Sequence, residues 1–184
     1  DAYFYILHRE GTPFSNMMNI EMEGVGIFGH VFTRPEDRRQ GAASELMRRL
    51  MDHFTGRGGQ ALFLGTGFDS PPYHIYRTQG FEGVEDKSGN MAFYAHSQEA
   101  FEATYFAEGR TEVETLDWVH WPASPALFLA DFPGVVRGAG MGIFGRGSTE
   151  GKLLPLLRDA MERKEQGKPA RVVALRQVET TAVV

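Results

Sequence analysis

The chain has 184 residues, 42% of them hydrophobic and 12% aromatic, which suits one domain or a compact pair of domains with a buried core. Its formal net charge of −5 argues against bulk binding to nucleic acid, and its hydrophobic stretches are too short to span a membrane. It has no cysteine, which excludes disulfides and thiolate metal sites, and its six histidines lack metal-ligand spacing. We therefore expect a cytoplasmic protein without a metal site, a membrane partner or a nucleic-acid partner.

The first half of the chain predicts a sheet with helices inserted into it. In chain order, the pattern predicts a strand over 2–8, a strand ending near 23, a strand over 27–33, a helix over 42–54, a strand over 61–64, a helix around 70–79, and strands near 81–85 and 90–96. The first three strands follow one another through short turns, which is typical of an antiparallel meander. The helix over 42–54 carries its apolar residues on one stripe, so we expect this stripe to face the core.

The second half predicts further helices and strands around a glycine-rich segment. Ser97 is the expected N-cap of a helix that carries Phe101 and Tyr105. The pattern then predicts a strand over 111–116, a loop over 134–151, a helix over 153–164 with Pro155 in its first turn, and a strand over 172–178. Val183 and Val184 predict the start of one more strand.

The stretch 31–44 ends an apolar, β-branched run at a proline and continues through a basic loop into a helix. This order directs the backbone N–H groups of a helix N-terminus at an anion. Arg38 and Arg39 add positive charge, and Gly41 lets an anion approach the backbone closely. The pattern Arg38-x-x-Gly41-x-Ala43 resembles the pyrophosphate loop of the GNAT (Gcn5-related) N-acetyltransferase family, which uses acetyl-coenzyme A.

A second motif lies downstream, at the distance that the family leads one to expect. Tyr76-x-x-x-Gly80-Phe81 resembles the family's helix-to-strand signature, in which the tyrosine faces the thioester sulfur. The resemblance covers about the first half of the chain. It implies an α/β GNAT acyl-CoA N-acyltransferase fold, with a central mixed, mostly antiparallel sheet flanked by helices.

The resemblance also implies how acetyl-coenzyme A (acetyl-CoA) would bind. The backbone of Val31 and Thr33, with Phe32 between them, would pair with the pantetheine arm like an added strand. The pyrophosphate would be held by the loop of Arg38, Arg39, Gln40, Gly41, Ala42, Ala43 and Ser44.

Two tyrosines are candidates for the general acid. When an amine attacks a thioester, the departing thiolate needs a proton or a hydrogen bond, which a tyrosine hydroxyl can supply. The resemblance implies this role for Tyr76. Tyr73, three residues earlier on the same helical face, is the alternative.

The general base is not defined by any motif. His30 precedes the expected cofactor strand and titrates near neutrality, and Glu21 and Glu23 lie on the preceding strand. The family's frequent asparagine after the fifth strand is absent, and Gly65-Thr66-Gly67 stands in its place.

The two halves of the chain suggest a division of one fold. Residues 1–96 would form a cofactor-binding core that lacks the family's usual first strand and two helices, and residues 97–184 resemble that opening half. The segment 170–180 also repeats the pattern of 2–12, although two hairpins can be alike by chance. Because a bare sheet edge invites pairing, we expect residues 97–184 to pack on the core, within one chain or exchanged between two chains of a homodimer.

These features predict an N-acetyltransferase that moves an acetyl group from acetyl-CoA to an amine of a small molecule or peptide by direct attack. A non-catalytic coenzyme A-binding module, acting as a sensor or a structural domain, is the alternative. The acceptor pocket falls among the residues that resemble the family least, so the sequence does not identify the acceptor.

Overall fold

The computed structural model describes residues 1–130, 150–180 and 182. The chain divides into two compact units, Asp1–Ala95 and His96–Val184. Among the described residues, no helix has the length and apolar character needed to cross a membrane. The packing of residues 97–184 on the 1–96 core, and the homodimer, stay predictions.

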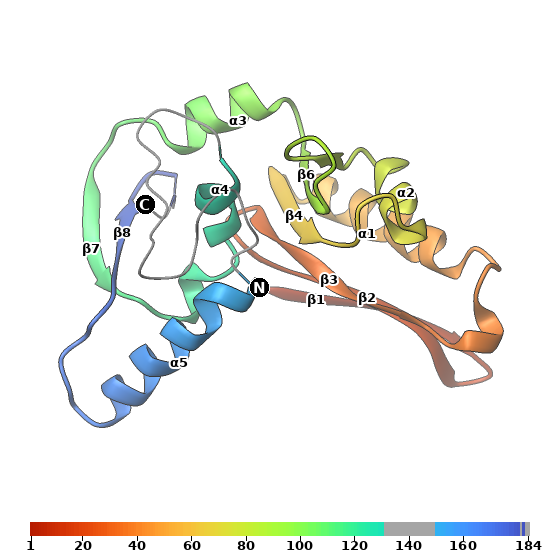
Figure 1. The fold of residues 1–184 in the computed structure, drawn as a ribbon, viewed down its shortest axis with the longest axis horizontal. Helices are drawn as coiled ribbons and strands as arrows, with labels where there is room; N and C mark the ends of the chain where they lie inside the picture. Colours follow the sequence, from red (N-terminus) through yellow and green to blue (C-terminus); the bar gives the residue numbers. More distant parts are fainter. Residues whose placement is uncertain (131–149, 181, 183–184) are drawn as a thin grey trace. The chain divides into compact units, whose positions relative to one another are not determined.

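The first unit is a six-stranded sheet with helices. Its elements are β1 (Ala2–Arg9), β2 (Thr12–Met22), β3 (Val25–Thr33), the 3-10 helix η1 (Pro35–Asp37), α1 (Ala42–Gly56), β4 (Ala61–Gly65), α2 (Pro71–Arg77), β5 (Glu82–Gly83) and β6 (Asn90–Tyr94) (Figure 1). The strand order is β1-β2-β3-β4-β6-β5, in which β3 and β4 pair in parallel and the other neighbours pair antiparallel. The predicted α/β fold with a mixed, mostly antiparallel sheet is confirmed.

Two tight turns set the register of the β1–β2–β3 meander. Glu10 and Gly11 form the first turn, Glu23 and Gly24 form the second, and all four residues have positive φ. Positive φ at both central residues is the signature of the type I′ turn, whose twist matches that of the strands it joins. The meander predicted from the turn residues therefore has a local cause.

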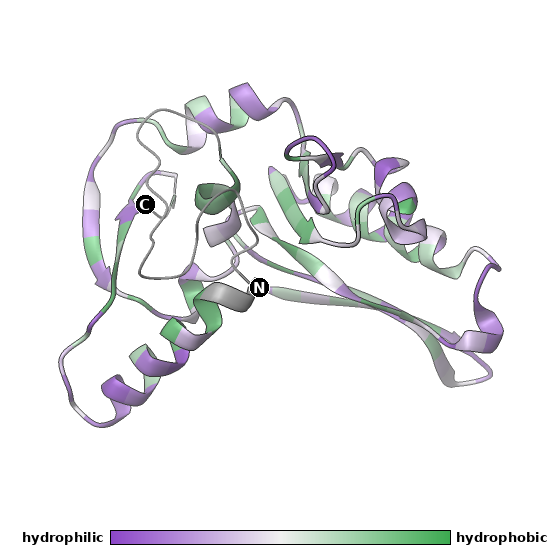
Figure 2. Cartoon of the chain, in the orientation of Figure 1, coloured by the Kyte–Doolittle hydropathy of each residue, from purple (hydrophilic) through white to green (hydrophobic). Residues whose placement is uncertain are grey.

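α1 packs its apolar stripe against one face of the sheet. Leu46, Met47, Leu50 and Phe54 are at most 2% exposed, as the periodicity predicts, and they join side chains of β2, β3, β4, β6 and α2 in one cluster. Each such side chain contributes about 1.5–3 kcal/mol relative to leaving it in water. Figure 2 shows β4 hydrophobic along most of its length, as expected for a strand that is buried on both faces over its first four residues. Because these side chains anchor α1 on the sheet, the first turn of α1 has a fixed position.

The second unit contains α3 (Gln98–Tyr105), β7 (Thr111–Thr115), the 3-10 helix η2 (Trp118–His120), α4 (Ser124–Leu129), α5 (Glu150–Glu165) and β8 (Val173–Gln177). Ser97 caps α3 as predicted, because its hydroxyl accepts the N–H of Ala100 at 3.1 Å. β7 and β8 pair antiparallel, and Arg176 binds Glu114 across the pair at 2.7 Å. The loop predicted over 134–151 lies outside the described residues except for its last two positions, and the strand start predicted at residues 183–184 lies outside them entirely.

The predicted start of α5 was wrong. The sequence places Pro155 in the first turn of a helix over 153–164, but the helix begins at Glu150 and Pro155 lies inside it. A proline inside a helix leaves one carbonyl of the preceding turn without its helical N–H partner. The helix tolerates this loss near its start because Leu153 and Leu157, on either side of the proline, are 4% and 0% exposed.

Candidate functional site

β3 separates from β4 part of the way along its length. The two strands pair only over Val25–Ile27 and Ala61–Phe63, so β4 does not cover the rest of β3. On this uncovered part, Val31 and Phe32 are 37% and 49% exposed. The residues predicted to bind the pantetheine arm therefore lie where an extended chain can add to a strand edge.

A β-bulge precedes these residues in β3. Asn16 and Met18 of β2 are two positions apart, but their partners Phe32 and Gly29 are three positions apart, so β3 carries one extra residue. His30, in the extra stretch, has a φ of 52°. This left-handed conformation is uncommon for a residue with a Cβ.

The bulge decides which face of the sheet Thr33 occupies. Side chains alternate along a strand, so one extra residue moves every later side chain to the opposite face. Thr33 pairs with Ser15, and the two hydroxyls lie 2.8 Å apart. Ser15 is 2% exposed and alternates in step with Met17, which packs in the cluster under α1. The hydroxyl of Thr33 consequently lies on the face that α1 covers.

Three contacts hold the loop between β3 and α1. Arg9 Nη1 donates to the buried carboxylate of Asp37 at 2.6 Å, and Arg38 Nε donates to the last carbonyl of β3 at 3.1 Å. Gln40 Nε2 donates to a carbonyl of η1 at 2.9 Å. A loop that side-chain hydrogen bonds hold in place loses less conformational freedom when a ligand binds.

The first turn of α1 presents unused backbone donors. Gly41 starts the helix with a φ of 83°, and no side chain caps it. The first helical bond runs from the N–H of Glu45 to the carbonyl of Gly41 at 2.9 Å, so the N–H groups of Ala42, Ala43 and Ser44 have no helical partner. A Cβ at Gly41 would meet no atom within 4 Å, so the space there is open. Open amides at the positive end of a 15-residue helix can bind an anion.

Positive charge dominates around these amides. Glu45 would repel an anion, but Arg49 and Arg48 bind its carboxylate at 2.6 and 3.1 Å. The hydrogen bond from Arg49, followed by that from Arg48, lowers the pKa of Glu45. Arg38 and Arg39 are both exposed at the loop. The local balance of charge therefore favours a negatively charged group.

A pocket of about 380 Å³ gathers these groups. It is lined by Thr33, Asp37, Arg38, Arg39, Gly41, Ala42, Ala43 and Ser44, and by Pro71, Pro72 and Ile75 of α2. The structure thus brings most of the predicted loop residues together with the end of β3 and the start of α2. Val31, Phe32 and Gln40 lie beside the pocket in the chain but do not line it, and neither Tyr73 nor Tyr76 lines it.

The two tyrosines of α2 are equally buried, at 8% exposed, but they face different strands. The ring of Tyr76 meets Phe28 of β3 edge-on, with centroids 5.3 Å apart, next to the point where β3 leaves β4. The hydroxyl of Tyr73 lies by β5 instead, 3.3 Å from where a Cβ on Gly83 would stand. Burial raises the pKa of Tyr76, so its hydroxyl keeps its proton at neutral pH.

None of the residues considered as a general base lines the pocket. Glu21 is buried and bound by Arg57 at 2.8 Å and by the amide of Asn19 at 2.5 Å. Glu23 lies in the turn between β2 and β3, and His30 is exposed at the bulge. The structure therefore commits Glu21 to an ion pair and brings neither of the others to the pocket.

Sequence reasoning missed the polar residues of β2 that hold β3. Asn16 Nδ2 donates to the carbonyl of His30 at 2.8 Å, and the hydroxyl of Ser15 donates to the carbonyl of Phe32 at 3.0 Å. The sequence did contain a signal. Neighbouring residues of a strand face opposite sides, so two adjacent polar residues within a half-buried strand require one of them to point into the core.

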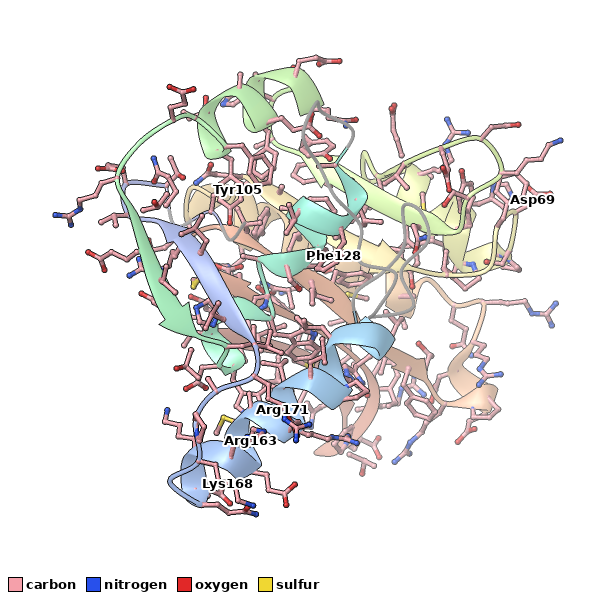
Figure 3. The ribbon with its side chains drawn as sticks, turned by 60° about the vertical axis from the view of Figure 1, so that its left-hand side comes forward. Asp69, Tyr105, Phe128, Arg163, Lys168 and Arg171 are labelled. Carbon is pink, nitrogen blue, oxygen red and sulfur yellow. The ribbon has the colours of Figure 1, made fainter. Side chains whose placement is uncertain are left out.

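A second hollow, of about 440 Å³, lies in the second unit at the C-terminal end of α5. Figure 3 shows Arg163 and Lys168 at this end of the helix. Lys164 is bound to Asp117 at 2.8 Å, and Arg163 donates to the carbonyl of Pro169 at 3.0 Å, so two of its cations already have partners. Nowhere in the described part of the chain do three His, Asp or Glu side chains gather as a metal site would need.

Comparison with known families matches a segment within the first unit. Residues 8–81 match the model of the acetyltransferase (GNAT) family. No match was found among curated proteins. The predicted family resemblance is therefore confirmed for the segment that contains the pocket.

Solved structures similar to the chain include the PaiA N-acetyltransferase of Thermoplasma acidophilum in complex with coenzyme A, at 14% identity and a TM-score of 0.45. That likeness covers 51% of this chain and 61% of the other, so this chain spans less than two thirds of the Thermoplasma protein. Tetrahymena Gcn5 is 13% identical, with a TM-score of 0.44 and 52% and 69% of the two chains covered. The ribosomal-protein-S18-alanine N-acetyltransferase of Escherichia coli is 19% identical, with a TM-score of 0.44 and 50% and 68% covered.

Proposed function

Residues 8–81 carry the sequence pattern of the acetyltransferase (GNAT) family, and on this premise we propose that the protein is an N-acetyltransferase. It would move an acetyl group from acetyl-CoA to an amine of a small molecule or a peptide. The observation that carries the proposal is the 380 Å³ pocket, in which Thr33, the open amides of α1 and the start of α2 meet.

The residues present fit the anionic end of coenzyme A. The N–H groups of Ala42, Ala43 and Ser44 are unused by the helix, and the position above Gly41 is open. These donors would bind the pyrophosphate, and the arginines of the loop would add charge. The uncovered part of β3, over 31–33, would hold the pantetheine arm through its backbone. The donor itself would supply an activated thioester.

Tyr76 is the proposed general acid. Its place beside Phe28 sets it near the start of the uncovered part of β3, whereas the hydroxyl of Tyr73 lies by β5. Its hydroxyl is protonated at neutral pH, because burial raises its pKa, and would donate a hydrogen bond to a leaving thiolate. A positioned acid of this kind contributes about 10²–10⁴-fold to the rate. Holding donor and amine in reacting geometry would contribute the rest.

The test is to measure binding and turnover separately. We expect acetyl-CoA to bind in calorimetric titration and to raise the melting temperature. We also expect release of free thiol when acetyl-CoA and a panel of amines and peptides with free amino groups are added. A folded chain that binds no acetyl-CoA would overturn the proposal.

A coenzyme A-binding module without catalysis is the second candidate. It is favoured by one observation: the candidate bases Glu21, Glu23 and His30 all lie outside the pocket lining, as do Tyr73 and Tyr76. An attacking amine must lose a proton, and a site without a base relies on solvent or on the substrate for that step. The same titration and amine panel separate the two functions, because a sensor binds acetyl-CoA and releases no thiol with any acceptor.

A further inference from the structure

We propose that Asn16 is a positioning residue for the cofactor: it holds the β3 bulge through the carbonyl of His30 and thereby keeps Thr33 on the pocket side of the sheet. The inference rests on the proposed function, because it concerns the same coenzyme A site. Asn16 is half-buried on β2, pairs with Phe32, and does not line the pocket. Its effect must therefore pass through β3.

The bulge needs support from outside β3. A left-handed conformation is disfavoured for a histidine, and such a residue persists only where its surroundings hold it there. The extra residue of a bulge also leaves the regular ladder of backbone hydrogen bonds. The side-chain amide of Asn16 supports the left-handed conformation and replaces a lost ladder bond, because its Nδ2 donates to the carbonyl of His30 at 2.8 Å.

Losing the bulge would move the side chains at the end of β3 to the opposite faces of the sheet. If the extra residue were absorbed into the regular ladder, Phe32 would turn toward the face under α1 and Thr33 would turn away from it. Thr33 would then lose the hydroxyl of Ser15, 2.8 Å away, and would no longer line the pocket. The backbone groups of the uncovered edge would exchange places as well, since N–H and C=O directions also alternate along a strand.

The first test is the affinity of Asn16→Ala for acetyl-CoA, measured by titration calorimetry on the full chain. We expect the Kd to rise about 5- to 10-fold, the usual effect of one lost hydrogen bond. We expect kcat at saturating acetyl-CoA to change less than twofold, because Asn16 does not touch the reacting atoms. Asn16→Asp, which keeps the shape but loses the N–H donor, should weaken binding in the same way.

Two controls separate positioning from general stability. Ile20→Ala removes a side chain from the same strand and the same face, but it pairs with Ile27, away from the bulge. It should lower the melting temperature and leave the Kd unchanged. Amide hydrogen exchange in peptides over 28–34 should speed up in Asn16→Ala and stay unchanged in Ile20→Ala.

The second test is rescue by glycine. Glycine adopts a positive φ without a steric cost, so His30→Gly should remove the need for the Asn16 bond. We therefore expect the double variant Asn16→Ala/His30→Gly to bind acetyl-CoA as tightly as His30→Gly alone. If Asn16 acted only on overall stability, Asn16→Ala would weaken acetyl-CoA binding by the same factor with histidine or with glycine at position 30.

An unchanged Kd in a folded Asn16→Ala chain would overturn the inference, and so would a loss of affinity that His30→Gly does not rescue. Both results leave the proposed function intact. A wild-type chain that binds no acetyl-CoA would instead overturn the proposed function, and this inference with it.

Discussion

Two helices begin at the same pocket, and their first turns differ. α2 starts after Ser70, whose hydroxyl accepts the N–H of Tyr73 at 3.4 Å, and its first two residues are prolines, which have no N–H to donate. α1 starts at Gly41 with no capping side chain and leaves three consecutive N–H groups without a helical partner. The chain therefore satisfies the start of α2 by itself and leaves the start of α1 open, in keeping with the proposal that α1 binds the pyrophosphate of the cofactor.

The difference assigns separate tasks to the two helices. α1 is long and anchored by four nearly inaccessible side chains, so its open first turn has a fixed position. α2 has seven residues and lines the pocket with Pro71, Pro72 and Ile75, and its proposed contribution to the chemistry is the hydroxyl of Tyr76. Variants of each helix should then affect different steps, with α2 acting on turnover and α1 on cofactor affinity.

The largest effect should come from the acid on α2. Tyr76→Phe should lower kcat by about 10²–10⁴-fold and change the Kd for acetyl-CoA less than twofold, because only the departing thiolate needs the hydroxyl. Steady-state kinetics together with calorimetric titration measure the two quantities. Tyr73→Phe, the matched control, should keep most of its activity. If Tyr73→Phe loses activity and Tyr76→Phe does not, the acid has been assigned to the wrong tyrosine.

The next effect should come from the start of α1. Gly41→Glu should weaken acetyl-CoA binding by about 100-fold or more, because it places a negative charge beside the proposed pyrophosphate site. Gly41→Gln has nearly the same size and the same backbone strain at a φ of 83°, but no charge. Equal losses in the two variants would show that shape, and not an anion, explains the effect. Unchanged affinity in a folded Gly41→Glu chain would remove the loop from the site.

A smaller effect should follow from removing the cap of α2. Ser70→Ala leaves the N–H of Tyr73 without its acceptor and should lower the free energy of unfolding by about 1 kcal/mol. The Kd for acetyl-CoA should stay within twofold of wild type. Urea denaturation and calorimetric titration give the two values. If the free energy of acetyl-CoA binding falls by more than the free energy of unfolding does, the start of α2 also binds the cofactor.

The smallest effect should appear in alkaline solution. In the unfolded chain, Tyr76 ionises near its ordinary pKa of about 10, whereas burial raises its pKa in the folded protein. Its contribution to stability is therefore complete below pH 10 and is lost as the pH rises through the folded-state pKa. Tyr76→Phe should lose less stability than wild type above pH 10. Tyr5 and Tyr105, whose pKa burial also raises, are present in both proteins and cancel.

Local signals predicted most of the elements. The apolar stripe over 42–54 predicted α1, and the glycines that follow it predicted its end, which lies at Gly56. Both signals depend only on residues a few positions apart in the chain. The loop 38–44 was found in the same way, since a basic, small-residue stretch before a helix is a local feature. Such signals lie within one segment of chain and need no knowledge of what packs on it.

Features that depend on a neighbouring strand could not be predicted. The bulge at His30 exists only in the pairing of β2 with β3, and a single histidine, although enriched at positive φ, does not locate a bulge. Helical spacing placed Tyr73 and Tyr76 on one face, but β5 and β3 decide which way each ring extends. The start of α5 was misplaced because the burial of Leu153 and Leu157, on either side of Pro155, outweighs a local rule.

The bulge has a consequence for protein engineering. A designer who moves the cofactor loop to another scaffold would naturally cut at Pro35, where η1 begins, and keep the loop and α1. That transplant would leave behind the two side chains, Ser15 and Asn16, that orient the strand feeding the loop. The smallest transferable module is therefore the β2–β3 hairpin with its loop and helix. An alignment of β3 to a strand without the bulge must likewise place a one-residue gap near His30, or it will assign Thr33 to the wrong side of the sheet.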